Sequence, residues 1–225
     1  MTSDTQIPLA LGHRPAMGQE DFLVAPCNEE AVAWIDSWPD WPAPALCVYG
    51  PAGCGKTHLA QVWCARSEAL MPPHGTLRQQ PPEQLLGDRT ACVIDDAEVD
   101  RDEGALLHLF NVISERRGHL LMTSKEPPAR WGYRLDDLRS RLAAAPAVAI
   151  GPPDDGLMGA VMIKLFADRQ LEVGQDAIIY ALMRIERSFE MARRVVDEID
   201  RASLSARRKV TVRLVRDVLR RLEAG

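Results

Sequence analysis

A glycine-rich octapeptide constrains the fold of this chain more than any other feature of its sequence. The segment Gly50-Pro-Ala-Gly-Cys-Gly-Lys-Thr57 matches the pattern G-x-x-x-x-G-K-[S/T] at every fixed position. It follows an apolar run, residues 45–50, typical of a buried strand, and it opens a helical segment, residues 56–70, that Pro72-Pro73 is expected to end. This order favours a loop whose backbone N–H groups converge on phosphate oxygens. The alternative is a glycine-rich turn that binds no nucleotide.

Candidate ligands for a nucleotide and its metal ion follow from this loop. Lys56 is expected to contact the β and γ phosphates, and the Thr57 hydroxyl is expected to bind Mg²⁺. A second apolar run, residues 90–96, ends in two acids, of which we assign Asp95 to the metal and Asp96 to the attacking water. The alternative is a strand end followed by an acidic turn. The predicted loop residues are Gly50, Pro51, Ala52, Gly53, Cys54, Gly55, Lys56 and Thr57.

The other apolar runs predict an α/β fold with a parallel, doubly wound sheet. Two more buried strands are expected at residues 119–124 and 147–150, and helices at 28–38 and 103–117 separate the strands. Only helical segments follow residue 153, at 156–170, 175–185, 188–206 and 211–223. We therefore predict an arm at residues 1–21, an α/β core at 22–152 and a small all-helical domain at 153–225.

Composition excludes several classes of protein. A chain of 225 residues with 46% hydrophobic side chains can bury a core, and no run is long enough for a membrane span. The N-terminus lacks the pattern of a signal peptide, and the five cysteines are never spaced as CxxC, so we expect a cytoplasmic protein with reduced thiols. The tryptophans Trp34, Trp38 and Trp41 are spaced for core packing; the alternative is a place near the base of a bound nucleotide.

The net charge of −5 hides a difference between the two ends of the chain. Residues 184–225 carry 12 basic and seven acidic residues, a net charge of +5, and the rest of the chain carries −10. A basic C-terminal segment is compatible with contact to nucleic acid or to an acidic partner. The alternative is a solvated helix surface.

Four segments resemble, in order and spacing, the DnaA-type AAA+ ATPases. They are residues 48–60, which include His58, residues 93–97, residues 121–128 and Leu138-Arg-Ser-Arg-Leu142. The resemblance covers about residues 20–222 and implies a AAA+ core with a helical lid that binds ADP or ATP with Mg²⁺. It places Arg141 at the family's arginine finger, which contacts the γ-phosphate held by a neighbouring subunit. The alternative is a surface arginine on a helix that also holds Arg134 and Arg139.

The two ends of the chain indicate the Hda group of this family, the regulatory inactivators of DnaA. Initiators continue into a DNA-reading domain, whereas this sequence stops at Gly225, and Asp200-Arg-Ala-Ser203 with residues 206–211 resembles the C-terminus of the Hda group. The segment from Gln6 to Leu11 resembles the peptide that docks on the DNA sliding clamp. Its contact residues would be Gln6, Ile7, Leu9 and Leu11; the alternative is a strand that packs on its own domain.

Two positions depart from the family pattern. Lys125 stands where an acidic residue is usual, and Glu190 aligns with the lid arginine that normally contacts the γ-phosphate, although Arg187 one turn earlier can substitute for it. We therefore expect weak or no intrinsic ATPase activity.

The resemblance implies a negative regulator of replication initiation that docks on clamp-loaded DNA and stimulates hydrolysis of DnaA-bound ATP. Its partners would be the sliding clamp and DnaA, with DNA contacted through the clamp and the protein associated with the nucleoid. An oligomer of this chain is compatible with this reading. Two alternatives remain: an autonomous AAA+ ATPase such as a helicase-loader-like remodeller, and a passive clamp-binding adaptor.

Overall fold

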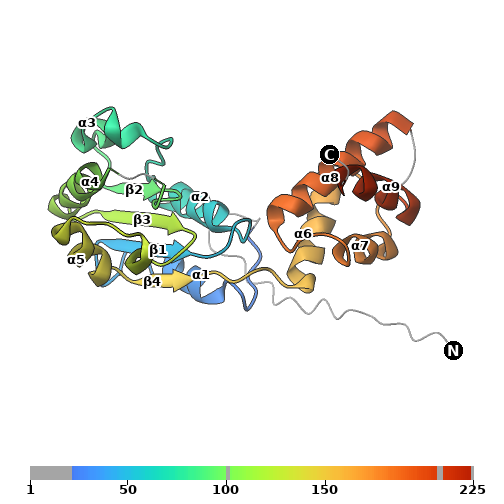
Figure 1. Ribbon diagram of the computed structural model, residues 1–225, viewed down its shortest axis with the longest axis horizontal. Coiled ribbons are helices and arrows are strands. Elements are labelled where there is room, and N and C mark those ends of the chain that lie inside the picture. The colour runs from blue at the N-terminus through green and yellow to red at the C-terminus, as the bar shows by residue number, and fades with distance from the viewer. Residues whose placement is uncertain (1–21, 100–101, 207–209, 224–225) are drawn as a thin grey trace. The chain divides into compact units, whose positions relative to one another are not determined.

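The computed structural model describes residues 22–99, 102–206 and 210–223 (Figure 1). The predicted arm with Gln6, Ile7, Leu9 and Leu11 lies outside the described residues. The chain divides into two compact units after Gly151, an α/β core and a helical lid. Within the described part of the chain, no helix is both long and apolar enough to cross a bilayer.

The core is built on a four-stranded sheet in which every pairing is parallel, as predicted. Strand β1 lies between β3 and β4, and β2 pairs with the outer side of β3, which gives the order β2-β3-β1-β4. Parallel strands end at the same edge, so the residues that follow β1, β2 and β3 come together there. The strands are β1 (Ala45–Tyr49), β2 (Ala91–Ile94), β3 (His119–Ser124) and β4 (Ala147–Ala149).

Helices cover both faces of this sheet because alternate strand residues point to opposite sides (Figure 1). Leu46 and Val48 of β1 pack into one cluster with residues of α1 and α2, whereas Ala45 and Cys47 pack into a second cluster with residues of α4 and α5. The core helices are α1 (Glu29–Asp36), α2 (Lys56–Ser67), α3 (Pro82–Leu86), α4 (Glu103–Glu115) and α5 (Asp136–Ala144), with short 3-10 turns at Thr76–Arg78 and Pro128–Arg130.

The sequence prediction was wrong at the end of α2. The helix ends at Ser67, where Glu68 takes a left-handed conformation with φ 53°, and the prolines are not what stops it. Leu70 instead pairs with Cys92 beside β2: its N–H donates to Ala91 O, and its carbonyl accepts from Val93 N–H. Hydrogen bonds to the sheet edge therefore compete successfully with helix continuation.

The sequence analysis missed helix α3 and gave no bounds for α5, although it considered a helix that holds Arg134, Arg139 and Arg141. Helix α5 buries only Leu138 and Leu142, four residues apart, so its apolar pattern is too short to stand out. It starts at Asp136, which places Arg134 before the helix and not on it as we had expected.

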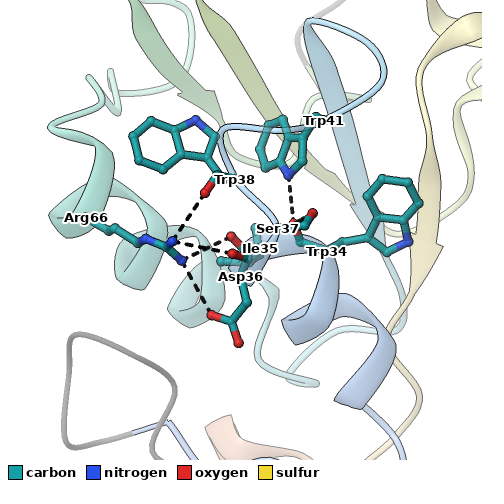
Figure 2. A network of polar contacts seen from close by, with 7 residues as sticks. All are labelled: Trp34, Ile35, Asp36, Ser37, Trp38, Trp41 and Arg66. Carbon is teal, nitrogen blue, oxygen red and sulfur yellow. Dashed lines mark hydrogen bonds and ion pairs between the residues drawn. The ribbon is translucent and has the colours of Figure 1, made fainter.

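The tryptophans pack in the core, as predicted, and Trp63 of α2 joins them. The Trp41 ring stacks on Trp63 with centroids 5.3 Å apart, and Trp38 meets Trp63 edge-on at 6.1 Å. The guanidinium of Arg66 donates hydrogen bonds to the carbonyls of Ile35, Asp36 and Trp38 (Figure 2). Arg66 of α2 thus supplies donors to the C-terminal carbonyls of α1, which have no partners within that helix.

In the part of the lid that the structure describes, four helices surround an apolar cluster to which Met162, Phe166, Val195 and Ile199 belong. Asp154 caps its first helix by accepting a hydrogen bond from Leu157 N–H at 2.7 Å. All four helices were predicted to within a few residues. They are α6 (Asp155–Asp168), α7 (Gln175–Leu182), α8 (Phe189–Ala206) and α9 (Val212–Glu223).

Candidate nucleotide-binding site

The glycines of the octapeptide meet steric demands that other residues cannot. Gly50 follows β1 and donates its N–H to Ser124 O at 3.1 Å; a Cβ at this position would lie 2.1 Å from the carbonyl oxygen of Ile150. Gly53 and Gly55 have φ values of 70° and 102°, which disfavour side chains. The loop thus turns from β1 into the N-terminus of α2, the geometry that binds phosphate.

Lys56, the first residue of α2, is buried, with 6% of its surface exposed. Its ammonium donates hydrogen bonds to the carbonyls of Gly50 and Pro51, both at 2.9 Å. These acceptors are neutral, so the described residues give the ammonium no ion-pair partner. A buried cation is costly without a countercharge, and a phosphate group in this loop would supply one.

Asp95 lies at the end of β2 and contacts the P-loop helix across the site. The Thr57 hydroxyl donates to Asp95 Oδ2 at 2.9 Å, and the Thr123 hydroxyl of β3 donates to Asp95 Oδ1. A hydroxyl oxygen beside a carboxylate is the kind of oxygen pair that binds Mg²⁺ together with phosphates. The residues therefore fit a Mg²⁺–nucleotide complex.

The backbone of Asp96 is held in an unusual conformation beside this pair. Its φ is 44°, in the left-handed region, and its N–H donates to the Thr123 hydroxyl at 2.9 Å. The next N–H, of Ala97, donates to the Thr123 carbonyl at 2.8 Å. Asp96 thus turns at the site immediately after Asp95, although its predicted role toward water stays a prediction.

Thr123 is a site residue to which sequence reasoning gave no role. It is fully buried, and its hydroxyl donates to the side chain of Asp95 while accepting from the backbone of Asp96. A signal was present, because two hydroxyl residues, Thr123 and Ser124, follow the apolar residues of the strand. Recognising it required knowing that β2 and β3 are neighbours, with Ile94 opposite Met122.

The segment after β3 is tied to the segment after β2. The backbone N–H of Lys125 donates to Glu98 Oε1 at 2.8 Å, and the Tyr133 hydroxyl donates to Ala97 O at 3.0 Å. The Lys125 side chain is exposed. The backbone of Lys125 is therefore fixed by Glu98, while its side chain carries a positive charge where the family usually has an acidic residue.

The cysteine thiols around the site are neutral at physiological pH. Burial raises the pKa of Cys47 to about 12, although a hydrogen bond with Ser124 opposes the shift. Burial also raises the pKa of Cys54 in the loop, partly offset by the positive charge of Lys56. Burial, with a smaller contribution from the Asp95 carboxylate, raises the pKa of Cys64 to about 11.

Arg141 lies on the exposed side of α5 in the core unit. Its neighbour Arg139 forms an ion pair with Asp136 at 3.2 Å, and Arg130 forms one with Glu126 at 3.8 Å. Within residues 22–99, 102–206 and 210–223, the Arg141 guanidinium has no ion-pair partner. It differs in this respect from Arg130 and Arg139.

The remaining predicted residues have partners that sequence reasoning did not specify. His58 of α2 stacks on Phe22 with ring centroids 5.4 Å apart. Arg187 belongs to the lid, where its guanidinium forms a bidentate ion pair with the Asp155 carboxylate, with hydrogen bonds of 2.9 and 3.1 Å. Glu190 is exposed in the first turn of α8.

Known proteins resemble this chain in its lid sequence and in its overall fold. Residues 160–219 match the family described as Hda, lid domain. Domain III of the Thermotoga maritima initiation protein DnaA superposes with a TM-score of 0.76 at 18% identity, over 92% of this chain and 97% of that chain. DnaA from Aquifex aeolicus bound to AMPPCP gives 0.66 at 18% identity, over 85% and 66% of the two chains. A mutant of RuvB from Thermotoga maritima gives 0.61 at 12% identity, over 80% and 63%.

The parallel sheet, the glycine loop between β1 and α2 and the helical lid give the chain the AAA+ fold. Within that fold, the lid sequence matches the Hda lid domain and the chain superposes on DnaA domain III, so the chain resembles Hda-like proteins of the DnaA branch. The resemblance noted in the sequence is thereby confirmed.

Proposed function

We propose that this protein is a DnaA-related negative regulator of replication initiation that acts in the nucleotide-bound state. The observation that carries the proposal is the match of residues 160–219 to the Hda lid domain, behind a core with the fold of DnaA domain III. Hda-type proteins inactivate DnaA, and DnaA would be the partner of this chain.

The bound nucleotide would be ADP or ATP with Mg²⁺. The loop from Gly50 to Lys56 would hold the phosphates through its backbone N–H groups and the buried ammonium, while Thr57 and Asp95 would hold the metal. A Mg²⁺ ion bound there neutralises phosphate charge and polarises the phosphoryl oxygens. The same core fold binds AMPPCP in DnaA from Aquifex aeolicus.

Arg141 would act in trans, on ATP held by DnaA. Its exposure on α5 and its lack of an ion-pair partner among the described residues leave the guanidinium available to a second protein. A guanidinium suits this role because it is always charged and offers two parallel donors to phosphate oxygens. The exposed Lys125 side chain and the pairing of Arg187 with Asp155 support slow turnover in cis.

Attachment to the sliding clamp would come from Gln6, Ile7, Leu9 and Leu11. These residues lie outside the described part of the chain, so this step rests on the sequence resemblance. An apolar groove can bury the spaced aliphatic side chains while Gln6 hydrogen-bonds at its edge, and Pro8 lowers the cost of ordering the peptide. The clamp would bring the protein to DNA and to the nucleoid.

The test is the rate at which DnaA-bound ATP becomes ADP with this protein and with clamp loaded on DNA. The proposal expects strong stimulation that needs this protein and the clamp together, and little turnover by the chain alone. Equal turnover without DnaA would establish the autonomous ATPase instead. Clamp binding without any stimulation would establish the passive adaptor.

A further inference from the structure

Helix α9 has two chemically opposite faces. Val215, Val218 and Leu219 are buried, with at most 6% of their surface exposed, and they pack in the lid cluster beside α7 and α8. Because successive residues advance by about 100° around a helix, Arg213, Arg216 and Arg220 fall on the side opposite these residues. All three arginines are exposed. Packing of the apolar side therefore fixes a row of guanidinium groups toward solvent.

The positive charge of this row is not neutralised by its described surroundings. From Arg213 to Arg221 the helix carries four arginines and a single carboxylate, Asp217, which lies 3.8 Å from Arg216. Neither Arg213 nor Arg220 has an ion-pair partner within residues 22–99, 102–206 and 210–223. Three arginines elsewhere in the lid do pair with acids: Arg169 with Asp197, Arg187 with Asp155 and Arg201 with Glu198.

The arginine face, defined here as Arg213, Arg216, Arg220 and Arg221, spans about 12 Å along the helix at a rise of about 1.5 Å per residue. Double-stranded DNA offers about one negative charge per 1.7 Å of its axis, so a row of this length meets several phosphates. The basic residues 207–209 lie outside the described residues and are left out of this definition.

We infer that the arginine face binds the phosphate backbone of duplex DNA, independently of base sequence. The chemistry of the face favours this partner over two others. No large hydrophobic side chain described on α9 is exposed, so the face lacks the apolar anchors on which protein partners depend. Residues 210–223 contain no aromatic side chain, so single-stranded bases have no ring on which to stack. This goes beyond the proposed function, in which DNA is contacted through the clamp.

Binding through this face is local and sensitive to salt. The whole chain carries a charge of −5, so long-range attraction to DNA is absent and the contact depends on the arginines themselves. We expect about three phosphate contacts. A plot of the logarithm of the binding constant against the logarithm of salt concentration should then have a slope of about −2.7. The affinity then drops about 40-fold between about 50 and 200 mM salt.

The experiment measures binding of the full chain to a fluorescent duplex across that salt range, without clamp or DnaA. The test variant is Arg213→Ala with Arg220→Ala, and the matched control is Arg89→Ala with Arg130→Ala, two exposed arginines of the core. Two lost contacts should weaken the slope by about 1.8, whereas the control should keep the wild-type slope. An unchanged melting temperature and ADP affinity show that the variants are folded.

Several outcomes would overturn the inference. These are an absence of duplex binding at low salt, an unchanged slope in the test variant, or an equal loss in the control. Tighter binding to single-stranded DNA than to the duplex would contradict the duplex assignment. In a competition experiment, poly-glutamate and unlabelled duplex DNA are added at equal concentrations of negative charge. If poly-glutamate displaces the labelled duplex more effectively, the partner is an acidic protein. Because neither clamp nor DnaA is present, this result and the test of the proposed function fail or succeed separately.

Discussion

Thr57 donates its hydroxyl to Asp95 at 2.9 Å, although the two residues are 38 positions apart in sequence. The contact joins the start of α2 to the end of β2, and Thr123 holds the other carboxylate oxygen of Asp95 from β3. The two oxygens of Asp95 are thus oriented by hydroxyls from two different elements. Three elements of the core therefore determine where the predicted metal-binding carboxylate lies.

Lys56→Ala should weaken nucleotide binding strongly and leave the core folded. Among the described residues, the buried ammonium hydrogen-bonds to the loop carbonyls of Gly50 and Pro51, so its removal mainly costs the contact to phosphate. A charge-assisted hydrogen bond contributes about 1.5 to 3 kcal/mol, which corresponds to a drop in affinity of about tenfold to over a hundredfold. Titration calorimetry with ADP and with ATP measures the two affinities. Equal affinities in the wild type and the variant would show that the loop is not the nucleotide site.

Thr123→Val should impair the metal dependence of nucleotide binding. Valine keeps the shape of this buried residue but leaves Asp95 Oδ1 and the N–H of Asp96 without their partner. The loss of such contacts costs about 1 to 3 kcal/mol, so the Mg²⁺ concentration needed for half-maximal binding should rise several-fold or more. Thr123→Ser, which keeps the hydroxyl, is the matched control. A wild-type Mg²⁺ titration in the valine variant would mean that Thr123 does not position Asp95.

Features that depend on local pattern were predictable from this sequence. The bounds of β3 were predicted correctly because the apolar run at residues 120–122 lies between His119 on one side and Thr123 and Ser124 on the other. The glycine loop was recognisable because backbone conformation and phosphate binding require particular residues at its fixed positions. At Gly50 a Cβ would clash with a backbone carbonyl, and Gly55 has a positive φ. Local sequence carries both kinds of information.

Features that depend on strand pairing were not predictable. Thr123 acquires its role only because β3 lies beside β2, and α2 ends early only because Leu70 pairs with Cys92. The spacing of apolar residues along a helix or strand carries no information about which strands are neighbours in the sheet. The bounds of α5 were not predicted for a different reason, since two buried leucines provide too little periodic signal.

Arg66→Ala should destabilise the core. Arg66 donates to three carbonyls at the end of α1, forms an ion pair with Asp36 at 3.5 Å and lies over the Trp38 ring (Figure 2). Because the side chain is 27% exposed, the loss should be about 1 to 2 kcal/mol and not the cost of a fully buried group. All five tryptophans lie in the core, so their fluorescence during urea unfolding reports this unit.

Arg89→Ala is the control for Arg66, since its side chain is exposed and its effect should stay within about 0.5 kcal/mol. An equal loss of stability in both variants would mean that the carbonyl contacts of Arg66 contribute nothing specific.

Removal of residues 1–12 should abolish co-elution with the sliding clamp while the melting temperature stays nearly unchanged. The expectation follows from placing the clamp contact in a terminal arm that adds little to the core. Changing Gln6, Leu9 and Leu11 to Ala should have the same effect. Size-exclusion chromatography of each variant mixed with purified clamp measures co-elution. Retained clamp binding, or unfolding of the truncated protein, would show that the arm has another role.

Arg141→Ala should leave the protein folded, nucleotide-bound and clamp-bound, yet unable to stimulate hydrolysis by DnaA. The guanidinium is exposed and unpaired among the described residues, whereas Arg139 is engaged with Asp136. Arginine fingers supplied by a partner accelerate hydrolysis by about 10³ to 10⁵, which is too large an effect for a solvated surface charge to imitate. Arg141→Lys should restore little, because an ammonium cannot form the two parallel bonds of a guanidinium.

The measurement for Arg141 is ATP-to-ADP conversion on DnaA with clamp-loaded DNA, and Arg139→Ala and Arg134→Ala are the matched controls. Both controls should retain most of the stimulation, because Arg139 already has a carboxylate partner and Arg134 precedes α5. Full stimulation by Arg141→Ala with a loss in one control would assign the finger to that other arginine. If all three variants stimulate as the wild type does, no arginine of this segment acts in trans, and the inactivation of DnaA must use a different surface of the protein.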